Sequence, residues 1–297
     1  RLHKDQRKLT AILGKAVRMV KSAKAFYGKP FVLFRLTGLF TPTPRNLVMQ
    51  IASYFAKDLF QGKTVFITGG SSGINLGIAR NFAAVGAHLG IVGRSRDKLD
   101  AAAAELRALG ARVSAHSADV RDYAALEKAM QNTRLELGPI HTLICGAAGN
   151  FPLAAEKISP NGFKSVVDID LLGSFHACRA AFEQLKETQG NIIFISAGMA
   201  FMPYAFQVHV GAAKAGIDNM MRNLALEWGQ FGIRCNSIAP GPIEGTEGVR
   251  RLVPADSADP LKRMIPLGRF GTPDDIGQLS VFLASPLASY IPGPLLV

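Results

Sequence analysis

The first part of the sequence that could do chemistry is the glycine-rich run TGGSSGINLG, which starts at Thr68 and ends at Gly77. It follows a short apolar segment and precedes a stretch with helical patterning. Glycine lets a backbone turn tightly and approach a pyrophosphate, which binds the unpaired N–H groups at a helix N-terminus. In this context the run predicts a nucleotide site, although a glycine-rich turn alone occurs in many proteins. The residues that we expect to line it are Thr68, Gly69, Ser71, Ser72, Gly73 and Ile74.

Two basic side chains form the second candidate, because Arg94 and Arg96 follow the apolar segment 88–92 and no acid stands there. In dinucleotide sites an acid at this place binds the ribose 2′-hydroxyl of NAD and repels the extra phosphate of NADP. Arginine, together with Ser71 or Ser72, suits a 2′-phosphate instead. The sequence therefore favours NADPH as the cofactor. The alternative is that both arginines are solvated side chains at a helix start.

The elements that must position these residues can be recognised from residue 63 onward, where short apolar segments alternate with stretches of helical patterning. The strand candidates are 64–68, 88–92, 113–116, 142–145, 191–195 and 234–238. The helix candidates are 74–86, 97–109, 121–137, 160–187, 208–231 and 273–285. Such alternation predicts parallel strands joined by right-handed crossovers. We therefore expect an α/β fold with a single doubly wound, Rossmann-type parallel sheet, helices on both faces, and the ligand at the carboxyl ends of the strands.

Composition excludes several other classes of protein. Of 297 residues, 48% are hydrophobic and 19% are charged, which is typical of a folded globular chain and not of a disordered one. The cysteines, Cys145, Cys178 and Cys235, are far apart and form no CxxC pair, so neither a disulfide framework nor a metal site is expected. The nearest approach to a spanning segment, 31–40, is short and contains Arg35, so no transmembrane helix is predicted.

The net charge of +12 is concentrated at the N-terminus. Residues 1–48 hold eleven basic side chains and one acid, whereas residues 49–297 hold 23 basic and 21 acidic ones. A nearly neutral globular part does not suggest a groove for DNA or RNA, so no nucleic-acid partner is expected. We divide the chain accordingly into a basic N-terminal extension, 1–48, and one globular domain, 49–297.

Within the extension, apolar and basic residues recur at helical spacing over 8–26. A basic amphipathic helix can make a weak contact with an anionic membrane surface, or it can act as an organelle presequence. The Thr-Pro-Thr-Pro run at 41–44 is then typical of a linker. The alternative is a disordered leader or translated upstream sequence, since Met49 would be a sensible start for the domain.

Several motifs in order make the globular part similar to the short-chain dehydrogenase/reductase family. They are Thr68-Gly-x-x-x-Gly73, Asp119, Gly146-Ala-Ala-Gly149, Lys214 on a long helix, and Pro240-Gly241. The resemblance covers about 49–297 and implies that Lys214 holds the nicotinamide ribose. It implies further cofactor contacts from Asp119 and Val120 at the adenine, from Gly146 and Ala147, and from Pro240, Gly241, Ile243 and Thr246 at the nicotinamide and pyrophosphate.

The sequence departs from the family pattern at two places. Asn75 stands where the family has its last glycine, which we expect to be tolerated because Asn accepts unusual backbone angles. The sequence given ends at Val297, before the family's usual Asp-Gly-Gly tail, so the last strand is expected to be incomplete.

The family's usual proton donor is missing. Most members reduce carbonyl groups with a serine, an asparagine and a tyrosine four residues before the lysine, and these positions hold Ala197, Leu172 and Val210. Tyr204 is ten residues before Lys214 and is expected on the preceding loop. Valine cannot donate a proton, so ordinary ketone reduction is disfavoured. Three readings stay open: a catalytically silent NADPH-binding regulator, a 3-oxoacyl thioester reductase, and a reductase whose substrate needs no proton at oxygen.

A narrower resemblance favours the last of these. Gly149-Asn-Phe151, Val167-Asp-Ile-Asp170, Gln207-Val-His209 and the run from Pro240 to Gly248 look like the 2,4-dienoyl-CoA reductases, especially the peroxisomal type and its bacterial relatives. The resemblance implies NADPH-dependent reduction of 2,4-dienoyl-CoA to 3-enoyl-CoA in unsaturated fatty acid oxidation. Hydride would add at C5, and a water positioned by Asp170 and Lys214 would protonate carbon. The alternative for Asp170 is a salt-bridged helix-surface acid, and for His209 a packing or interface histidine.

The same resemblance supplies expectations about partners. Coenzyme A carries phosphates, so Arg94, Arg121 and Arg251 would meet its nucleotide end, with Phe151, Ser159 and Asn161 along the acyl channel. The polar stretch 245–265 would cover the substrate as a lid. A homotetramer would form through the helices at 160–187 and 208–231. The near-neutral domain suits a bacterial cytoplasm, with a peroxisome or mitochondrion as alternatives, although the end Leu-Leu-Val is not a Ser-Lys-Leu signal.

Overall fold

The structure is a computed structural model that describes residues 55–252 and 258–297. The predicted helix at 8–26, the linker and the boundary at 48–49 lie outside the described residues, as does the middle of the predicted lid at 253–257.

A parallel sheet of seven strands forms the middle of the domain, in the order β3-β2-β1-β4-β5-β6-β7. The strands are β1 (Thr64–Thr68), β2 (His88–Gly93), β3 (Val113–Ser117), β4 (Ile140–Cys145), β5 (Asn191–Ile195), β6 (Arg234–Ile238) and β7 (Leu295–Leu296). Every residue of β1 and β5 is buried, because helices cover both faces of the sheet. The six predicted strands are confirmed, and the short β7 pairs with β6.

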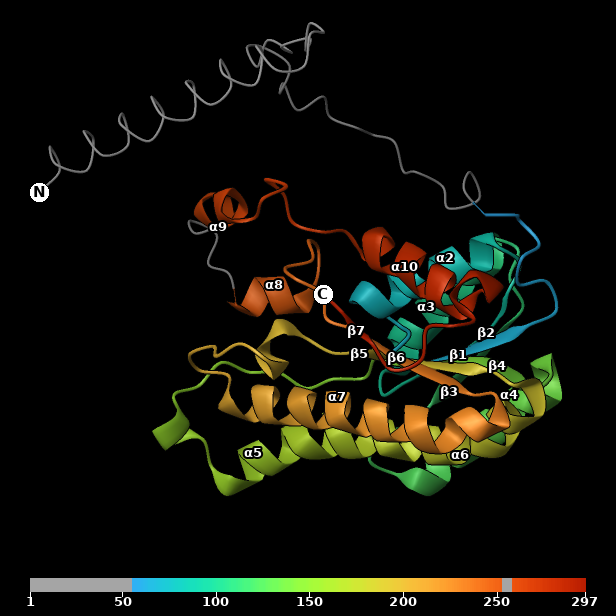
Figure 1. The fold of residues 1–297 in the computed structure, drawn as a ribbon, viewed down its shortest axis with the longest axis horizontal. Coiled ribbons are helices and arrows are strands. Elements are labelled where there is room, and N and C mark those ends of the chain that lie inside the picture. The colour runs from blue at the N-terminus through green and yellow to red at the C-terminus, as the bar shows by residue number, and fades with distance from the viewer. Residues whose placement is uncertain (1–54, 253–257) are drawn as a thin grey trace, which may run out of the picture. The chain divides into compact units, whose positions relative to one another are not determined.

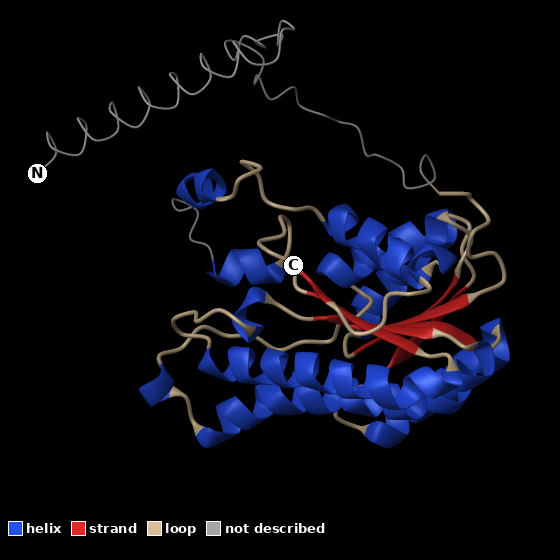
Figure 2. Ribbon diagram, in the orientation of Figure 1, coloured by secondary structure: helices blue, strands red, loops and turns tan. Residues whose placement is uncertain are grey.

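Figures 1 and 2 show helices on both sides of this sheet. One side carries α2 (Gly73–Ala84), α3 (Arg96–Ala108) and α10 (Pro273–Ala284), which share one apolar core with β1 and β2. The other carries α4 (Tyr123–Leu137), α6 (Gly173–Thr188) and α7 (Val208–Trp228), which pack on β4 and β5. The expected doubly wound α/β fold is therefore confirmed.

The predicted helix at 160–187 is formed, but it contains a π-helical turn that the periodicity did not predict. It divides into α5 (Pro160–Val167), a π-helical turn η3 (Asp168–Leu172) and α6. The Ser174 hydroxyl donates to the carbonyl of Asp170 at 2.5 Å, and a Cβ at Gly173 would lie 2.6 Å from Val120. The hydrogen bond lies within the helix, whereas Val120 belongs to the loop after β3, so the wider turn packs closely on that loop. Such turns are frequent at functional sites.

The predicted lid is made of two short helices, α8 (Glu247–Leu252) and α9 (Ala258–Met264), on either side of the undescribed residues 253–257. Cys145, Cys178 and Cys235 are free and buried, and burial raises the pKa of Cys235 to about 12. Among the described helices none is long and apolar enough to cross a membrane.

Candidate active site

The glycine turn lies between β1 and α2. Gly69 and Gly73 have φ values of 71° and 58°, which glycine adopts without strain. Ser72, the N-cap of α2, makes no side-chain hydrogen bond to the helix, and the first turn holds no acid. In contrast, α3, α4, α5 and α10 are each capped by a side-chain oxygen, from Ser95, Asp122, Ser159 and Thr272. The first N–H groups of α2 thus lack a side-chain cap, as a pyrophosphate site requires.

Asn75 has a different role from the one expected. It lies inside α2, and its φ is not positive, so the expectation of unusual backbone angles is wrong. Its Nδ2 donates to the carbonyl of Gly146 at 2.8 Å and to that of Gly69 at 3.3 Å. A Cβ at Gly146 would lie 2.1 Å from the Asn75 Oδ1. The amide therefore ties the glycine turn to the loop after β4, a contact that no local sequence signal reveals.

Thr68 also joins these two loops. Its Oγ1 accepts hydrogen bonds from the N–H groups of Gly146 and Ala147 at 3.0 and 3.2 Å, and it donates to the carbonyl of Ile144 at 3.3 Å. The hydroxyl is thus engaged within the protein. Its contribution to a cofactor site is to hold Gly146 and Ala147, which are partly exposed, beside the glycine turn.

The ends of β2 and β3 bring basic and acidic side chains together. Arg94 directly follows β2 and is exposed, and the Ser71 hydroxyl lies 3.3 Å from where a Cβ on Gly93 would be. Asp119, after β3, accepts hydrogen bonds from Nε and Nη2 of Arg121 at 3.0 and 2.7 Å. These bonds hold the pKa of Asp119 below its usual value, and the nearby charge of Arg94 acts in the same direction. This end of the sheet therefore brings Arg94 close to the Asp119–Arg121 ion pair.

The segment after β6 returns to the glycine turn. The carbonyl of Ile243 accepts a hydrogen bond from the Thr246 hydroxyl at 2.7 Å. The Thr246 methyl lies 3.9 Å from where a Cβ on Gly73 would be. A cavity of about 490 Å³ at this junction is lined by Gly73, Leu76, Arg80, Glu244, Gly245 and Pro273. Of the other predicted cofactor residues, Gly241 is exposed, Ile74 and Pro240 are half-buried, and Val120 is buried.

Asp170 and Lys214, the two residues predicted to act on the proton, form a buried ion pair. Asp170 lies in η3 and is completely buried, so the alternative of a helix-surface acid is wrong. Its Oδ2 lies 3.2 Å from the Nζ of Lys214, and its Oδ1 accepts a hydrogen bond from the N–H of Gly149 at 2.7 Å. Lys214, on α7, also donates to the carbonyl of Ile195 at 2.9 Å. The pair thus joins the ends of β4 and β5 to two helices.

Val210 fills the position of the missing tyrosine, and the nearest hydroxyl groups in the sequence belong to Ser196, one residue before Ala197, and to Tyr204. Val210 is buried and packs with Val166 and Ala213. The Ser196 hydroxyl donates to the Asp218 Oδ2 at 2.9 Å, so it is engaged with another side chain. Tyr204 lies on the loop before α7, as expected, and remains 49% exposed.

His209 is buried beside the ion pair. Its ring lies 4.4 Å from that of Phe151, measured between centroids. Burial lowers the pKa of His209, while the negative charge of Asp170 acts in the opposite direction. The lowered pKa favours the neutral imidazole, and both of its ring nitrogens are buried without a hydrogen-bond partner among the described residues.

The predicted substrate residues are spread over the same region. Arg251, on α8, donates from Nη1 to the carbonyl of Asn150 at 2.7 Å and so connects the lid to the loop after β4. The Ser159 hydroxyl accepts from the N–H of Gly162 at 3.0 Å as the cap of α5. Asn161 is exposed, whereas Phe151 is half-buried. The structure brings Phe151 and Arg251 to the loop that holds Asp170, while Arg94 and Arg121 lie at the ends of β2 and β3.

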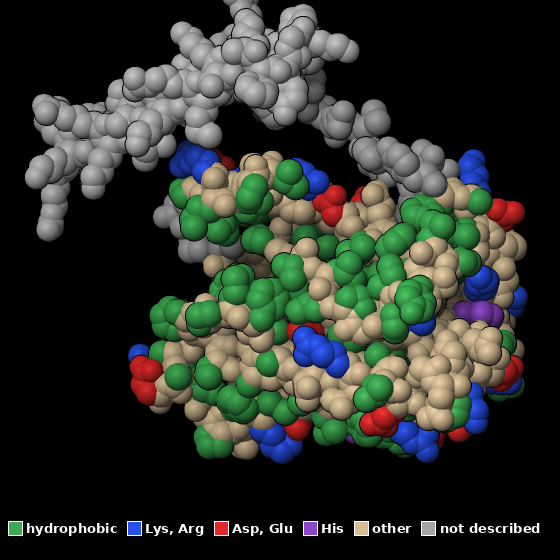
Figure 3. Space-filling model, in the orientation of Figure 1, with side chains coloured by type: hydrophobic (Ala, Val, Ile, Leu, Met, Phe, Trp, Pro, Cys, Tyr) green, Lys and Arg blue, Asp and Glu red, His purple; other side chains and the backbone are tan. Residues whose placement is uncertain are grey.

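Exposed apolar side chains lie next to this region. On the face shown in Figure 3, hydrophobic side chains gather where α8 and α9 stand opposite α5 and α7. The loop that leads into α7 contributes Phe201, Met202, Tyr204 and Phe206, each between 46% and 58% exposed. Large exposed apolar surface commonly marks a ligand or partner site.

Comparisons with known proteins agree with this arrangement. A family model described as enoyl-(acyl carrier protein) reductase matches residues 69–297. The peroxisomal 2,4-dienoyl-CoA reductase of Saccharomyces cerevisiae, named as (3E)-enoyl-CoA-producing, is 43% identical over 244 residues, or 81% of this chain and 84% of that protein. A Bacillus subtilis protein named as a probable 2,4-dienoyl-CoA reductase, (2E)-enoyl-CoA-producing, is 40% identical over 235 residues, or 78% and 92%.

A solved structure shares the fold. The citronellol catabolism dehydrogenase of Pseudomonas aeruginosa superposes with a TM-score of 0.71 at 36% identity, and the match covers 82% of this chain and 95% of that one. The resemblance inferred from the sequence motifs is thereby confirmed. The chain belongs to the short-chain dehydrogenase/reductase family of oxidoreductases.

Proposed function

We propose that the protein reduces 2,4-dienoyl-CoA to 3-enoyl-CoA with NADPH, by hydride addition at C5 and protonation on carbon by a positioned water. The observation that carries this proposal is the buried ion pair of Asp170 and Lys214, at 3.2 Å, next to a valine in place of the family's tyrosine. Because valine stands at the position of the family's proton-donating tyrosine, a reaction that places no proton on oxygen suits the site better than ketone reduction. The names of the relatives support the same reaction class.

The residues fit a nicotinamide dinucleotide. The first turn of α2 has no side-chain cap and no acid, and the glycines that precede it adopt left-handed angles. Arg94 and Ser71 would hold the 2′-phosphate, and Lys214 the nicotinamide ribose. When bound, NADPH supplies the hydride.

The chain's own groups would handle charge and proton. Reduction at C5 of a dienoyl thioester moves negative charge onto the thioester oxygen, which needs hydrogen-bond donors. The Lys214 ammonium has three N–H groups, of which one binds the carbonyl of Ile195 and one faces Asp170, so the third is left for the nicotinamide ribose. The Asp170 carboxylate would orient a water, which gives its proton to carbon, and the ammonium would neutralise the hydroxide left behind.

The substrate would lie beneath the lid. Arg251 on α8, together with Arg94 and Arg121, would meet the phosphates of coenzyme A. Phe151 would line the start of the acyl channel, with Ser159 and Asn161 farther along it. The exposed apolar loop before α7 supports an acyl path at this place.

The proposal is tested by following NADPH oxidation with the purified protein and two substrates. A 2,4-dienoyl-CoA should drive stoichiometric oxidation, and a 3-oxoacyl thioester should give little. The product should be the 3-enoyl thioester, which NMR distinguishes from the 2-enoyl isomer in the name of the Bacillus relative. Activity on the 3-oxoacyl thioester alone would make the protein a ketoreductase, and binding of NADPH without turnover of either would make it a regulator.

Cofactor preference provides a second prediction. We expect NADPH to bind at least about tenfold more tightly than NADH, which corresponds to about 1.4 kcal/mol. Arg94→Ala should remove most of this preference by weakening only NADPH, because Arg94 would meet the 2′-phosphate. Fluorescence titration of both nucleotides measures it. Lys98→Ala is the matched control, since Lys98 is an exposed cation on α3 that is not assigned to the nucleotide site. Equal affinities in the unmodified protein would refute the preference.

We also propose a homotetramer that uses α6 and α7. Both helices carry exposed apolar side chains, among them Phe175 at 45% and Leu226 at 82% exposure. Light scattering should give four times the 31.8 kDa of one chain. Phe175→Glu should dissociate the assembly, whereas a monomer in the unmodified protein would contradict the proposal.

We propose that the protein acts in a bacterial cytoplasm. The alternative is a peroxisome, the compartment in the name of the yeast relative.

A further inference from the structure

A second cavity lies at the amino ends of the strands, whereas the glycine turn lies at their carboxyl ends. It has a volume of about 210 Å³ and is lined by residues at the amino ends of β1, β4, β5 and β6 and by the segment after α10. Thr142 pairs in register with Asn191, and Asn191 with Arg234, so neighbouring strands carry these side chains along one edge. None of the proposed catalytic or cofactor residues takes part in it.

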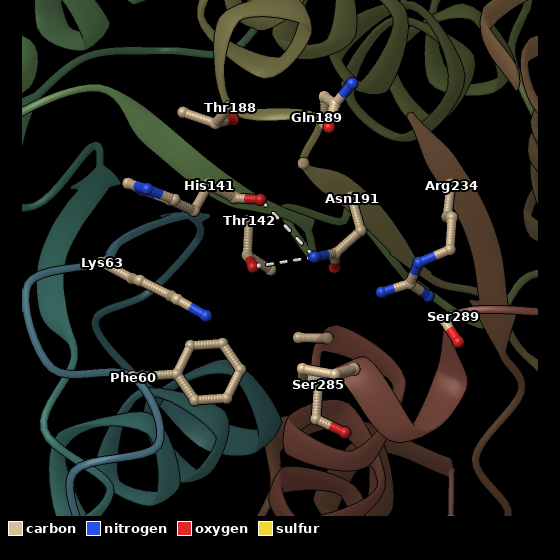
Figure 4. A pocket seen from close by; sticks show the side chains of 13 residues that line it. Phe60, Lys63, His141, Thr142, Thr188, Gln189, Asn191, Arg234, Ser285 and Ser289 are labelled. Atoms are coloured by element: carbon tan, nitrogen blue, oxygen red, sulfur yellow. Dashed lines mark hydrogen bonds between the residues drawn. The ribbon is translucent and has the colours of Figure 1, made fainter. Parts of the chain in front are cut away.

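Two cations face each other across this cavity. Figure 4 shows the Lys63 ammonium and the Arg234 guanidinium pointing into it from opposite sides, with the Asn191 amide between them. Three strand spacings of about 4.8 Å, or roughly 14 Å, separate β1 from β6, which two long basic side chains can bridge through one small ligand. Lys63 packs over the ring of Phe60 at 5.3 Å, and one N–H group of Arg234 donates to the carbonyl of Leu283 at 2.7 Å.

No acid balances these charges at the cavity. The lining, drawn from the described residues, contains no Asp or Glu. The nearby Glu187 pairs with Arg134 at 2.7 Å. Arg234 is half-buried, and burial lowers its pKa. Half-buried cations without a counter-ion are unfavourable, so an anion between them would be stabilising.

Asn191 adds a requirement for a hydrogen-bond donor. Its side chain is 4% exposed, and its Nδ2 donates to the Thr142 Oγ1 at 3.1 Å. Its Oδ1 is buried without a hydrogen-bond partner. A buried acceptor of this kind favours a ligand that carries an O–H group as well as negative charge. Hydrogen phosphate has both, whereas sulfate has only the charge.

From these observations we infer that the cavity is a binding site for a phosphate-class anion, held between Lys63 and Arg234 with its O–H donated to Asn191. The volume equals roughly seven water molecules at about 30 Å³ each, and it lies below the roughly 300–1,000 Å³ of sites for larger ligands. The ligand is therefore inorganic phosphate or the phosphate group of a small monoester. Such a ligand would connect β1, β4, β5 and β6 to the segment after α10 and would stabilise the fold at a distance from the proposed active site.

Thermal unfolding of the full chain in sodium phosphate tests this, with sodium chloride at matched ionic strength as the reference. At a tenfold excess over the dissociation constant, phosphate should raise the unfolding midpoint by about 3–6 °C. Sulfate should raise it less. Glycerol 3-phosphate is compared with inorganic phosphate, and the tighter of the two identifies the source of the phosphate group.

Variants assign the effect to the cavity. Lys63→Gln should weaken phosphate binding at least tenfold, measured by calorimetry, and abolish the increase in the unfolding midpoint. The Lys63 side chain makes no hydrogen bond or ion pair in the described structure, so the substitution breaks none. Lys128→Gln removes the same charge from an exposed position on α4 and should behave as the unmodified protein does. Arg94→Ala should also keep the shift. The inference would be overturned if phosphate did not raise the unfolding midpoint at all, or still raised it in Lys63→Gln. It would also be overturned if only Arg94→Ala lost the increase, because phosphate would then bind at the coenzyme site.

Discussion

Asp170→Asn is expected to lower the turnover of 2,4-dienoyl-CoA by about 10²–10⁴-fold, the usual worth of a positioned acid or base. The substitution keeps the shape of the side chain and lets its carbonyl oxygen accept from the N–H of Gly149, but it removes the charge that faces Lys214 at 3.2 Å. NADPH affinity should hardly change, because Asp170 lies in η3 and not in the glycine turn. Steady-state kinetics and fluorescence titration measure the two effects separately.

The same turn provides a matched control. Asp168 is exposed to solvent over 22% of its side chain and pairs with Lys164, so Asp168→Asn removes an equal charge at the surface. Its turnover should stay within about twofold of the unmodified enzyme, since exposed ion pairs contribute little. If Asp170→Asn kept near-normal turnover, the carboxylate would be a structural group and another residue would deliver the proton.

A tyrosine at the family position should not rescue this variant. Val210 is 3% exposed and packs with Val166 and Ala213, so Val210→Tyr would overfill the cluster. Its phenol would in addition supply a proton to oxygen and not to carbon. Recovery of dienoyl-CoA turnover in Asp170→Asn/Val210→Tyr would contradict the proposed role of the water.

Lys214→Met is expected to weaken both cofactor binding and turnover and to destabilise the fold. The ammonium is 8% exposed as a side chain and holds Asp170 and the carbonyl of Ile195. Removal of one partner from a buried ion pair typically costs about 3–5 kcal/mol, because the other charge is left uncompensated. Turnover should fall by at least about 10²-fold, since the ammonium that would neutralise the hydroxide is lost. Denaturant titration, nucleotide titration and kinetics give the three readouts.

The double variant Asp170→Asn/Lys214→Met tests whether Asp170 and Lys214 depend on each other. Because it leaves no uncompensated charge, its loss of stability should be clearly smaller than the sum of the two single losses. The two losses of turnover should likewise fail to add, since the residues act as a unit. Additive effects on both quantities would mean that Asp170 and Lys214 act independently, in conflict with the proposed mechanism.

Much of this architecture could be predicted from local patterns. The predicted segments matched six strands to within two residues at either end, because strands covered on both faces are mostly apolar, although β3 and β6 also carry polar side chains. The glycine turn was predictable for a similar reason, since left-handed angles such as those of Gly69 and Gly73 require that residue type. The resemblance to the family's motifs singled out Asp170, Lys214 and the valine at the tyrosine position, Val210.

Other features depend on contacts between distant parts of the chain. Helical periodicity alone predicted one helix at 160–187, and the π-turn that buries Asp170 becomes visible only with the neighbouring loop in place. The role of Asn75 rests on a carbonyl 71 residues away. The two cations of the second cavity are Lys63, directly before β1, and Arg234, the first residue of β6. They are far apart in sequence, but the amino ends of these strands lie on the same side of the sheet.

The sequence by itself thus determined which elements form and which residue types stand at their ends, because burial and backbone conformation act over a few residues. Only the tertiary structure decided which of those ends meet. Asp170 and Lys214 lie 3.2 Å apart because the π-turn and α7 pack at the ends of β4 and β5. Such proximity follows from strand order and packing, which no local pattern encodes.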